Sequence, residues 1–266
     1  YIKAWCALKV ISKVYGLGDP DGFVFNMSVG YDLEGIKGRK VNSYIDNMMD
    51  ASKTAQFQEC LAVLTEMFPD EKEFIAGISP RVSRSVTVST LHGCPPQEIE
   101  NIVMYLLREK HINTYVKCNP TLLGYEFVRK AMDDLGYDYM AFTDFHFKDD
   151  LQYEDAVPML RRLKEVAAQE GLSFGVKLTN TFPVDIKRQE LPGEEMYMSG
   201  KALFPLSITV AARLAESFDG ELPMSFSGGA DQKNIDQIVG CGIWPVTVAT
   251  VLLKPGGYKW MTRIAE

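Results

Sequence analysis

The pattern of hydrophobic and polar positions predicts short strands that alternate with amphipathic helices along most of the chain. Period-two alternation or a run of β-branched residues indicates a strand, whereas apolar residues repeating every three or four positions indicate a helix. These patterns predict strands at 23–29, 85–90, 113–118, 139–143, 173–179, 223–227 and 244–250. Helices are predicted at 1–15, 43–68, 97–110, 154–170, 206–218 and 233–239, with another that ends at 135.

This alternation is typical of an α/β protein, in which a parallel sheet is covered by helices. A helix precedes the first of the seven predicted strands, so a (βα)8 TIM-type barrel that lacks its first strand explains the order better than a doubly wound sheet. The 266 residues match the length of one such barrel, and we expect a single domain over 1–266. Because the chain starts without Met and inside a predicted helix, we interpret it as a segment of a longer multidomain polypeptide.

One stretch departs from the regular pattern. Residues 182–204 contain prolines and glycines with no clear period, and the stretch is longer than an ordinary connection. We predict that it forms a lid or a binding loop.

Composition excludes several classes of partner. The formal net charge is −7 without a basic run, which argues against nucleic acid and against an anionic membrane surface. The chain contains neither an apolar run of membrane-spanning length nor a signal peptide.

Five cysteines lie far apart, which favours a reducing, cytoplasmic setting and argues against an iron–sulfur cluster or a structural zinc in this segment. No His, Asp and Glu residues have ligand spacing, so we expect no metal site.

The last two predicted strands end in residues suited to binding a phosphate. Ser227, Gly228 and Gly229 follow one strand, and Ala249 and Thr250 end the next. Two glycines let the backbone approach a ligand closely, and late strand ends of a barrel often bind phosphate. The alternative is a tight turn between strand and helix.

Polar residues at earlier strand ends extend this candidate site. Lys177 lies between Val176 and Leu178, so alternation directs its amine away from them and into the barrel mouth. It could stabilise a reduced cofactor, form a Schiff base, or pair with a core carboxylate. Asn119 and Asn180 suit a planar, amide-like ring but are also common turn residues, and Lys117 adds a second cation.

A loop after the second predicted strand contains His92 and Cys94 on either side of a glycine. Either side chain could act as a general acid or base, and a cysteine near a histidine could have an accessible thiolate. The alternatives are a histidine that hydrogen-bonds its own loop and a small buried cysteine. His146 is a weaker candidate of the same kind.

Taken together, Val-Lys-Leu-Thr, Lys-Cys-Asn-Pro, the Gly-Gly turn and the final Ala-Thr resemble the FMN barrel of the dihydroorotate/dihydropyrimidine dehydrogenase superfamily. Five longer runs resemble more closely the barrel domain of the bacterial selenate reductase-like (YgfK-type) iron–sulfur flavoproteins. These runs cover most of the chain and read STLHGCPP, VKCNPTLLGYEF, GVKLTNT, YMSGKALFPLSI and SFSGGAD.

The resemblance implies a role for each candidate residue. Lys177 would lie at the N1/O2 edge of the flavin, and Asn119 and Asn180 would face the ring or the substrate. Binding of the phosphate would involve five residues: Ser227, Gly228, Gly229, Ala249 and Thr250. Cys94 lies on an earlier loop than the catalytic cysteine or serine of the superfamily, so the resemblance leaves the proton donor unassigned.

We therefore expect an FMN-dependent oxidoreductase domain that exchanges electrons with a small heterocyclic or oxyanion substrate. The resemblance implies FAD, NAD(P)H and iron–sulfur clusters only in other redox domains or subunits. Selenate reduction is implied by the family name alone, since no residue selects a selenium oxyanion. Two alternatives stay open: a lyase or aldolase that uses Lys177 as a Schiff base, and a docking module without cofactor, whose mouth would be plugged by side chains from 182–204.

Overall fold

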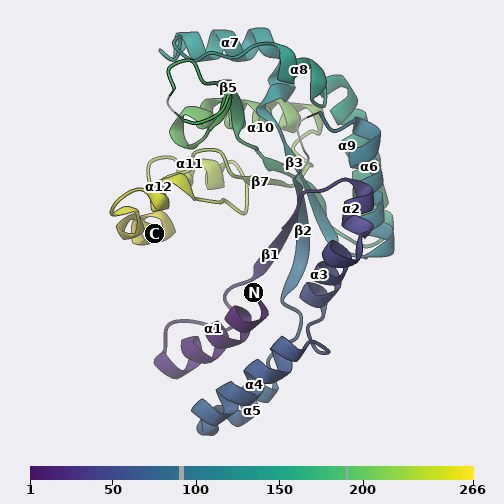
Figure 1. Cartoon of the computed structure of the whole chain (residues 1–266), viewed down its shortest axis with the longest axis vertical. Helices are drawn as coiled ribbons and strands as arrows, with labels where there is room; N and C mark the ends of the chain where they lie inside the picture. Colours follow the sequence, from purple (N-terminus) through teal and green to yellow (C-terminus); the bar gives the residue numbers. More distant parts are fainter. Residues whose placement is uncertain (90–92, 190) are drawn as a thin grey trace. The chain divides into compact units, whose positions relative to one another are not determined.

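A computed structural model describes residues 1–89, 93–189 and 191–266 of the chain. The chain forms two compact units, Tyr1–Thr87 and Val88–Glu266 (Figure 1). Both units combine helices with strands, and the candidate site lies entirely in the second.

The first unit is mostly helical. Its elements are α1 (Ile2–Tyr15), β1 (Phe25–Val29), α2 (Leu33–Lys37), α3 (Arg39–Met49), α4 (Ala55–Met67), the 3₁₀ turn Pro69–Glu71, α5 (Lys72–Ala76) and β2 (Ser83–Ser89), whose last two residues belong to the second unit. Helix α1 packs against α4, and the buried indole of Trp5 donates a 2.9 Å hydrogen bond to the carbonyl of Ser79. The buried ammonium of Lys9 lies 4.2 Å from the Trp5 ring and also binds Pro20 O and Asp21.

The single helix predicted at 43–68 is wrong, because α3 and α4 are separate helices. Asp50 accepts a 2.9 Å hydrogen bond from the backbone of Ser52, and Thr54 caps α4 by accepting one from Phe57 at 3.2 Å. Side chains of this kind compete with the helical backbone and favour caps.

The second unit contains the parallel strands that position the site. Its elements are α6 (Pro96–Met104), the π-helical turn Tyr105–Glu109, β3 (Asn113–Cys118), the 3₁₀ turn Pro120–Leu123, α7 (Tyr125–Asp134), α8 (Phe145–Asp149), α9 (Tyr153–Gln169), β4 (Phe174–Leu178), β5 (Phe182–Asp185), β6 (Glu195–Met198), the 3₁₀ turn Gly200–Leu203, α10 (Phe204–Ser217), β7 (Met224–Phe226), α11 (Ile235–Gly240), α12 (Thr250–Leu253), the 3₁₀ turn Gly257–Trp260 and α13 (Met261–Ala265). Helices α6 and α9 lie side by side (Figure 1). Both oxygens of Glu100 on α6 accept 2.7 Å hydrogen bonds from Arg162 on α9, which lowers the pKa of that carboxyl group.

The three strands β3, β4 and β7 lie next to one another in parallel, in that order. Because side chains alternate between the two faces of a sheet, register partners share a face. Lys117 on β3 is paired with Lys177 on β4, which is paired with Ser225 on β7. Two residues earlier, Tyr115 is paired with Gly175, and these residues form the next row on the same face.

The strand predicted at 139–143 does not form. Its carbonyl groups bind other partners: Met140 O accepts a 2.8 Å hydrogen bond from the Arg129 guanidinium, and Ala141 O accepts one of 2.7 Å from the backbone of Asp185. Phe142 is buried against Phe182 and under Arg129. The phenylalanine of the segment enters this aromatic cluster, and its carbonyl groups are bound singly by Arg129 and by the end of β5 instead of in a strand ladder.

The strand predicted at 244–250 is reduced to a single bridge between Val246 and Phe226 of β7. Trp244 and Thr247 donate hydrogen bonds to Met224 O and Phe226 O at 3.0 and 2.7 Å, and Pro245 O accepts one at 3.0 Å. Pro245 has no N–H group to continue the ladder. The segment therefore pairs only briefly before α12 begins at Thr250.

Residues 182–204 contain more regular structure than the sequence predicts. Strands β5 and β6 pair in antiparallel register, with Phe182 opposite Met198 and Asp185 opposite Glu195. The short 3₁₀ turn Gly200–Leu203 then leads into α10. The predicted lid or binding loop is thus a hairpin and a turn, and the turn contributes to the candidate site.

Substitution of Gly175 by alanine should destabilise the protein. A Cβ atom there would lie 2.4 Å from Pro223 O and 2.6 Å from the Tyr115 ring, so the strands or the ring must shift. We expect Gly175→Ala to lower the free energy of unfolding by about 1–3 kcal/mol, measured by urea denaturation. Gly240→Ala is the control, since a Cβ there meets no atom within 4 Å. Equal stability of the two variants would contradict this account of the strand packing.

Candidate functional site

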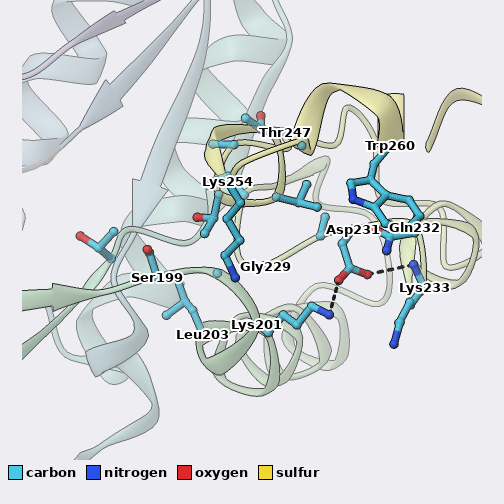
Figure 2. Close-up of a pocket in the computed structure, with 18 of the residues that line it drawn as sticks. Ser199, Lys201, Leu203, Gly229, Asp231, Gln232, Lys233, Thr247, Lys254 and Trp260 are labelled. Carbon is cyan, nitrogen blue, oxygen red and sulfur yellow. Dashed lines mark hydrogen bonds and ion pairs between the residues drawn. The ribbon is translucent and has the colours of Figure 1, made fainter. Parts of the chain in front are cut away.

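A cavity of about 700 Å³ opens at the carboxyl ends of β3, β4 and β7 (Figure 2). Its walls come from these strand ends, from residues 199–203, from the turn at 227–233 and from residues 247–260. The volume falls within the range of about 300–1,000 Å³ that is typical of small-molecule sites. Carboxyl ends of parallel strands are also where barrel enzymes place their catalytic groups.

Two half-buried lysines, Lys117 and Lys177, line this cavity from adjacent strands. Burial lowers the pKa of Lys177, because a low-dielectric environment disfavours the charged form. Burial also lowers the pKa of Lys117, and the neighbouring charge of Lys177 lowers it further. Among the described residues, no carboxylate forms an ion pair with Lys177. The predicted pairing of Lys177 with a core carboxylate is therefore not seen in this part of the chain.

The turn after β7 is held by hydroxyl groups. Thr179 Oγ1 lies 2.7 Å from Ser207 Oγ on α10, and the Ser227 hydroxyl donates a 3.1 Å hydrogen bond to Thr179 O. A Cβ atom on Gly228 would lie 2.0 Å from Ser207 Oγ, and one on Gly229 would lie 2.2 Å from Gly200 O. Gly229 also has a positive φ of 80°. Contacts within the protein therefore require glycine at both positions.

A second group of lysines lies around this turn (Figure 2). The Lys201 ammonium forms a 3.1 Å ion pair with the buried carboxylate of Asp231, which also accepts a 2.8 Å hydrogen bond from the backbone of Lys233. In the view of Figure 2, the amine end of Lys254 points toward Gly229. Five lysines and one carboxylate thus line the cavity within the described residues, although the whole chain has a net charge of −7. This local excess of positive charge favours an anionic ligand.

The structure brings together most of the residues predicted to bind the cofactor. Lys177, Ser227, Gly229, Ala249 and Thr250 all line the cavity. Gly228 does not line it, and a Cβ atom at this position would meet Ser207. The assigned roles of these residues stay predictions.

The two asparagines that were predicted to face the cofactor ring or the substrate do not line the cavity. The Asn119 amide donates a 3.1 Å hydrogen bond to the buried carboxylate of Asp150, which also accepts hydrogen bonds from Thr121 Oγ1 at 2.7 Å and from Gly93 N at 2.9 Å. The backbone of Asn180 donates to Cys118 O at 2.8 Å. In this structure both asparagines help to order the strand ends.

The predicted acid–base candidates also lie away from the cavity. Cys94 is half-buried but does not line it, and the preceding Gly93 is held by Asp150. His92 lies outside the described residues. His146 Nε2 lies 2.7 Å from Glu195 Oε1 on β6, so it connects α8 to the hairpin.

Several residues of the cavity were not singled out by the sequence. These are the ion pair Lys201 and Asp231, the cation Lys254 and the aromatic Trp260. Lys201 and Asp231 lie inside two of the runs that carry the family resemblance, which was the available signal. Lys254 and Trp260 follow the last predicted strand, and nothing in their spacing marked them.

No three His, Cys, Asp or Glu side chains within 1–89, 93–189 and 191–266 lie together so that they could hold a metal ion. Over the same ranges, no helix combines the length and the apolar character needed to cross a bilayer.

Comparison with known proteins adds the family. A family model described as "Oxidoreductase YgfK, N-terminal TIM-barrel domain" matches residues 1–266. A relative from Escherichia coli strain K12, named "Putative oxidoreductase YgfK", is 48% identical over 97% of this chain, and a protein of the same name from Escherichia coli O157:H7 matches equally well. The chain spans 27% of the length of these relatives.

Two solved structures show distant likeness. Ligand-free DHODH from Eimeria tenella has a TM-score of 0.41 and 14% identity over 80% of this chain and 55% of that chain. A 3-hexulose-6-phosphate synthase has a TM-score of 0.34 and 14% identity over 97% and 91%. Such distant likeness carries no information about ligands. The family match, by contrast, covers every residue, and the chain belongs to the family of oxidoreductase YgfK N-terminal TIM-barrel domains.

Proposed function

We propose that this domain binds FMN in the lysine-rich cavity and exchanges electrons with a small substrate. The observation that carries the proposal is Lys177, a half-buried ammonium at a strand end that faces a cavity of about 700 Å³ without a carboxylate partner among the described residues. A cation that is partly removed from water is stabilised by a compensating negative charge. In an oxidoreductase domain, a reduced cofactor ring supplies such a charge.

The residues present fit the two ends of FMN. Lys177 would hold the electron-accepting edge of the ring, and Gly229 and Thr250 would offer backbone groups to the phosphate, with Lys201 and Lys254 adding positive charge. When bound, FMN supplies the electron transfer chemistry itself, and the protein supplies position and electrostatics. The two threonines after β4, Thr179 and Thr181, add hydroxyl groups to the same wall.

The source of electrons is part of the proposal. The relatives extend well beyond the length matched by this chain. We propose that redox domains or subunits outside this segment, carrying FAD, NAD(P)H sites and iron–sulfur clusters, exchange electrons with the FMN. A cavity that opens at the strand ends leaves the ring accessible to a small substrate.

A second function is favoured by one observation, the lowered pKa of Lys177. A lysine that is neutral at lower pH is a better Schiff-base former, as a lyase or aldolase needs. Borohydride trapping of carbonyl compounds on Lys177 would support this reading. The docking-module alternative predicts a mouth plugged by residues 182–204. Among the described residues of that stretch, Ser199, Gly200, Lys201 and Leu203 line the cavity.

The first prediction is stoichiometric FMN binding that depends on Lys177. Titration of the flavin-free protein with FMN, followed by flavin fluorescence, should saturate at one FMN per chain. Loss of one charged contact should weaken binding of the Lys177→Met variant about tenfold or more, which corresponds to about 1.4 kcal/mol. Lys130→Met is the matched control, because Lys130 is exposed on α7 and paired with Asp134. Absence of FMN binding by the wild-type protein would overturn the proposal.

The second prediction concerns the free-energy penalty of burying the charged amine of Lys177 in the ligand-free protein. Because burial lowers its pKa in the folded state, the penalty is fully present below that lowered value. It fades as pH rises toward the unfolded value of about 10.4. We expect Lys177→Met to raise Tm at pH 7 by roughly 2–4 °C, equivalent to about 1 kcal/mol, and by less at pH 10.

Differential scanning calorimetry at the two pH values measures this effect, with Lys130→Met again as the control. An unchanged Tm at pH 7 would show that burial of the Lys177 amine does not destabilise the folded protein. A gain of the same size at both pH values would show that methionine simply packs better.

A further inference from the structure

Gln232 lies in the turn that follows β7 and lines the cavity (Figure 2). Its side-chain oxygen, Oε1, is buried and has no hydrogen-bond partner among the described residues. The large majority of buried side-chain polar atoms in proteins are hydrogen-bonded, and an unpaired buried acceptor destabilises the folded state. An acceptor of this kind in the wall of a cavity indicates a contact that a ligand completes.

The backbone on both sides of Gln232 is held by hydrogen bonds within the turn. The Asp231 backbone N–H donates to Asn234 Oδ1 at 2.8 Å, and the Lys233 backbone N–H donates to Asp231 Oδ1 at 2.8 Å. The Asn234 side chain donates to Gly229 O at 3.2 Å. Because the residues before and after Gln232 are fixed, its side chain starts from a defined point on the cavity wall. A ligand contact at this point then costs less conformational freedom.

The positively charged part of the cavity is next to Gln232. Gly229 comes three residues earlier in the chain, and the Lys201 ammonium forms its 3.1 Å ion pair with the adjacent Asp231. Under the proposed function, Gly229, Lys201 and Lys254 bind the phosphate. The side-chain amide of Gln232 is uncharged, so it suits the neutral part of the ligand beside the phosphate.

The chemistry of a side-chain amide limits the ligand group that can complete the contact. An amide oxygen only accepts hydrogen bonds, so the ligand must donate, and an ionised phosphate or carboxylate oxygen cannot do so. A hydroxyl group can donate to Oε1 and can also accept from the amide nitrogen of Gln232. A chain that carries hydroxyl groups and ends in a phosphate therefore matches Gln232 and the glycine turn together.

We propose that Gln232 is a specificity-determining residue that accepts a hydrogen bond from a hydroxyl group of a phosphorylated polyol chain. In FMN this chain is the ribityl group between the ring and the phosphate. The inference rests on the proposed function, because it assigns the space beside the phosphate to the neutral chain of the same ligand. A site built to hydrogen-bond a hydroxyl group discriminates against an analogue that lacks it, so Gln232 favours a polyol phosphate over a phosphate ester with an apolar chain.

The test uses two pairs of ligands that differ only in the hydroxyl groups of the chain. One pair is FMN and an analogue in which an n-pentyl chain with the same terminal phosphate replaces the ribityl phosphate. The other pair is ribitol 5-phosphate and n-pentyl phosphate. Isothermal titration calorimetry measures the affinity of each ligand for the wild type, Gln232→Leu and Gln237→Leu. Gln237→Leu is the matched control, because Gln237 is exposed on α11 and does not line the cavity.

Gln232→Leu should weaken the binding of FMN and of ribitol 5-phosphate about tenfold, which corresponds to about 1.4 kcal/mol. Its affinity for the two ligands without hydroxyl groups should change less than about threefold. Gln237→Leu should match the wild type with all four ligands. The ligand-free Gln232→Leu protein should have a Tm equal to or above that of the wild type, because leucine removes an unpaired buried acceptor. A purely structural role of Gln232 would instead lower Tm and weaken the binding of all four ligands.

The results with the two pairs also separate failure of this inference from failure of the proposed function. Equal weakening of both members of a pair would show that Gln232 does not recognise the hydroxyl groups, and unchanged affinities would show that it does not contact the ligand. If the wild type binds no FMN but binds ribitol 5-phosphate in a way that depends on Gln232, the hydroxyl contact stands and the flavin is rejected. If FMN binds equally well to the wild type and to Gln232→Leu, the flavin stands and this inference is rejected. Binding of none of the four ligands would overturn both.

Discussion

The parallel pairing of β3 with β4 places Lys117 and Lys177 on the same face of the sheet, at the wall of the cavity, and much of the site follows from this constraint. Burial lowers the pKa of both amines, and the neighbouring charge of Lys177 lowers that of Lys117 further. Backbone hydrogen bonds and the packing of Tyr115 over Gly175 fix the register beneath the two lysines.

The glycine turn illustrates how a single feature can serve both folding and binding. Gly228 and Gly229 have no room for side chains because Ser207 and Gly200 occupy that space. The close approach also brings α10 and the 3₁₀ turn before it to the edge of the cavity, so that Lys201 reaches Asp231. Close packing alone is sufficient to explain both glycines. The glycine pair by itself is therefore not evidence of a phosphate site.

The sequence predicted those parts of the fold that depend on local pattern. Strands β3, β4 and β7 were found because apolar residues alternate within them, and the cavity position of Lys177 follows from its apolar neighbours Val176 and Leu178. The order of strands and helices was sufficient for the α/β barrel class, and short motifs were sufficient for the family, which the comparisons confirm.

Tertiary structure decided what depends on residues far apart in the chain. The segment 139–143 is apolar but forms no strand, because Arg129 and Asp185 bind its carbonyl groups. Asn119 turns to Asp150, a residue 31 positions away. The adjacency of Lys117 and Lys177 is set by register alone, since a shift by one residue would place them on opposite faces. Sequence pattern therefore determined which side chains leave the strands toward the cavity, and only the long-range hydrogen bonds determined which of them meet.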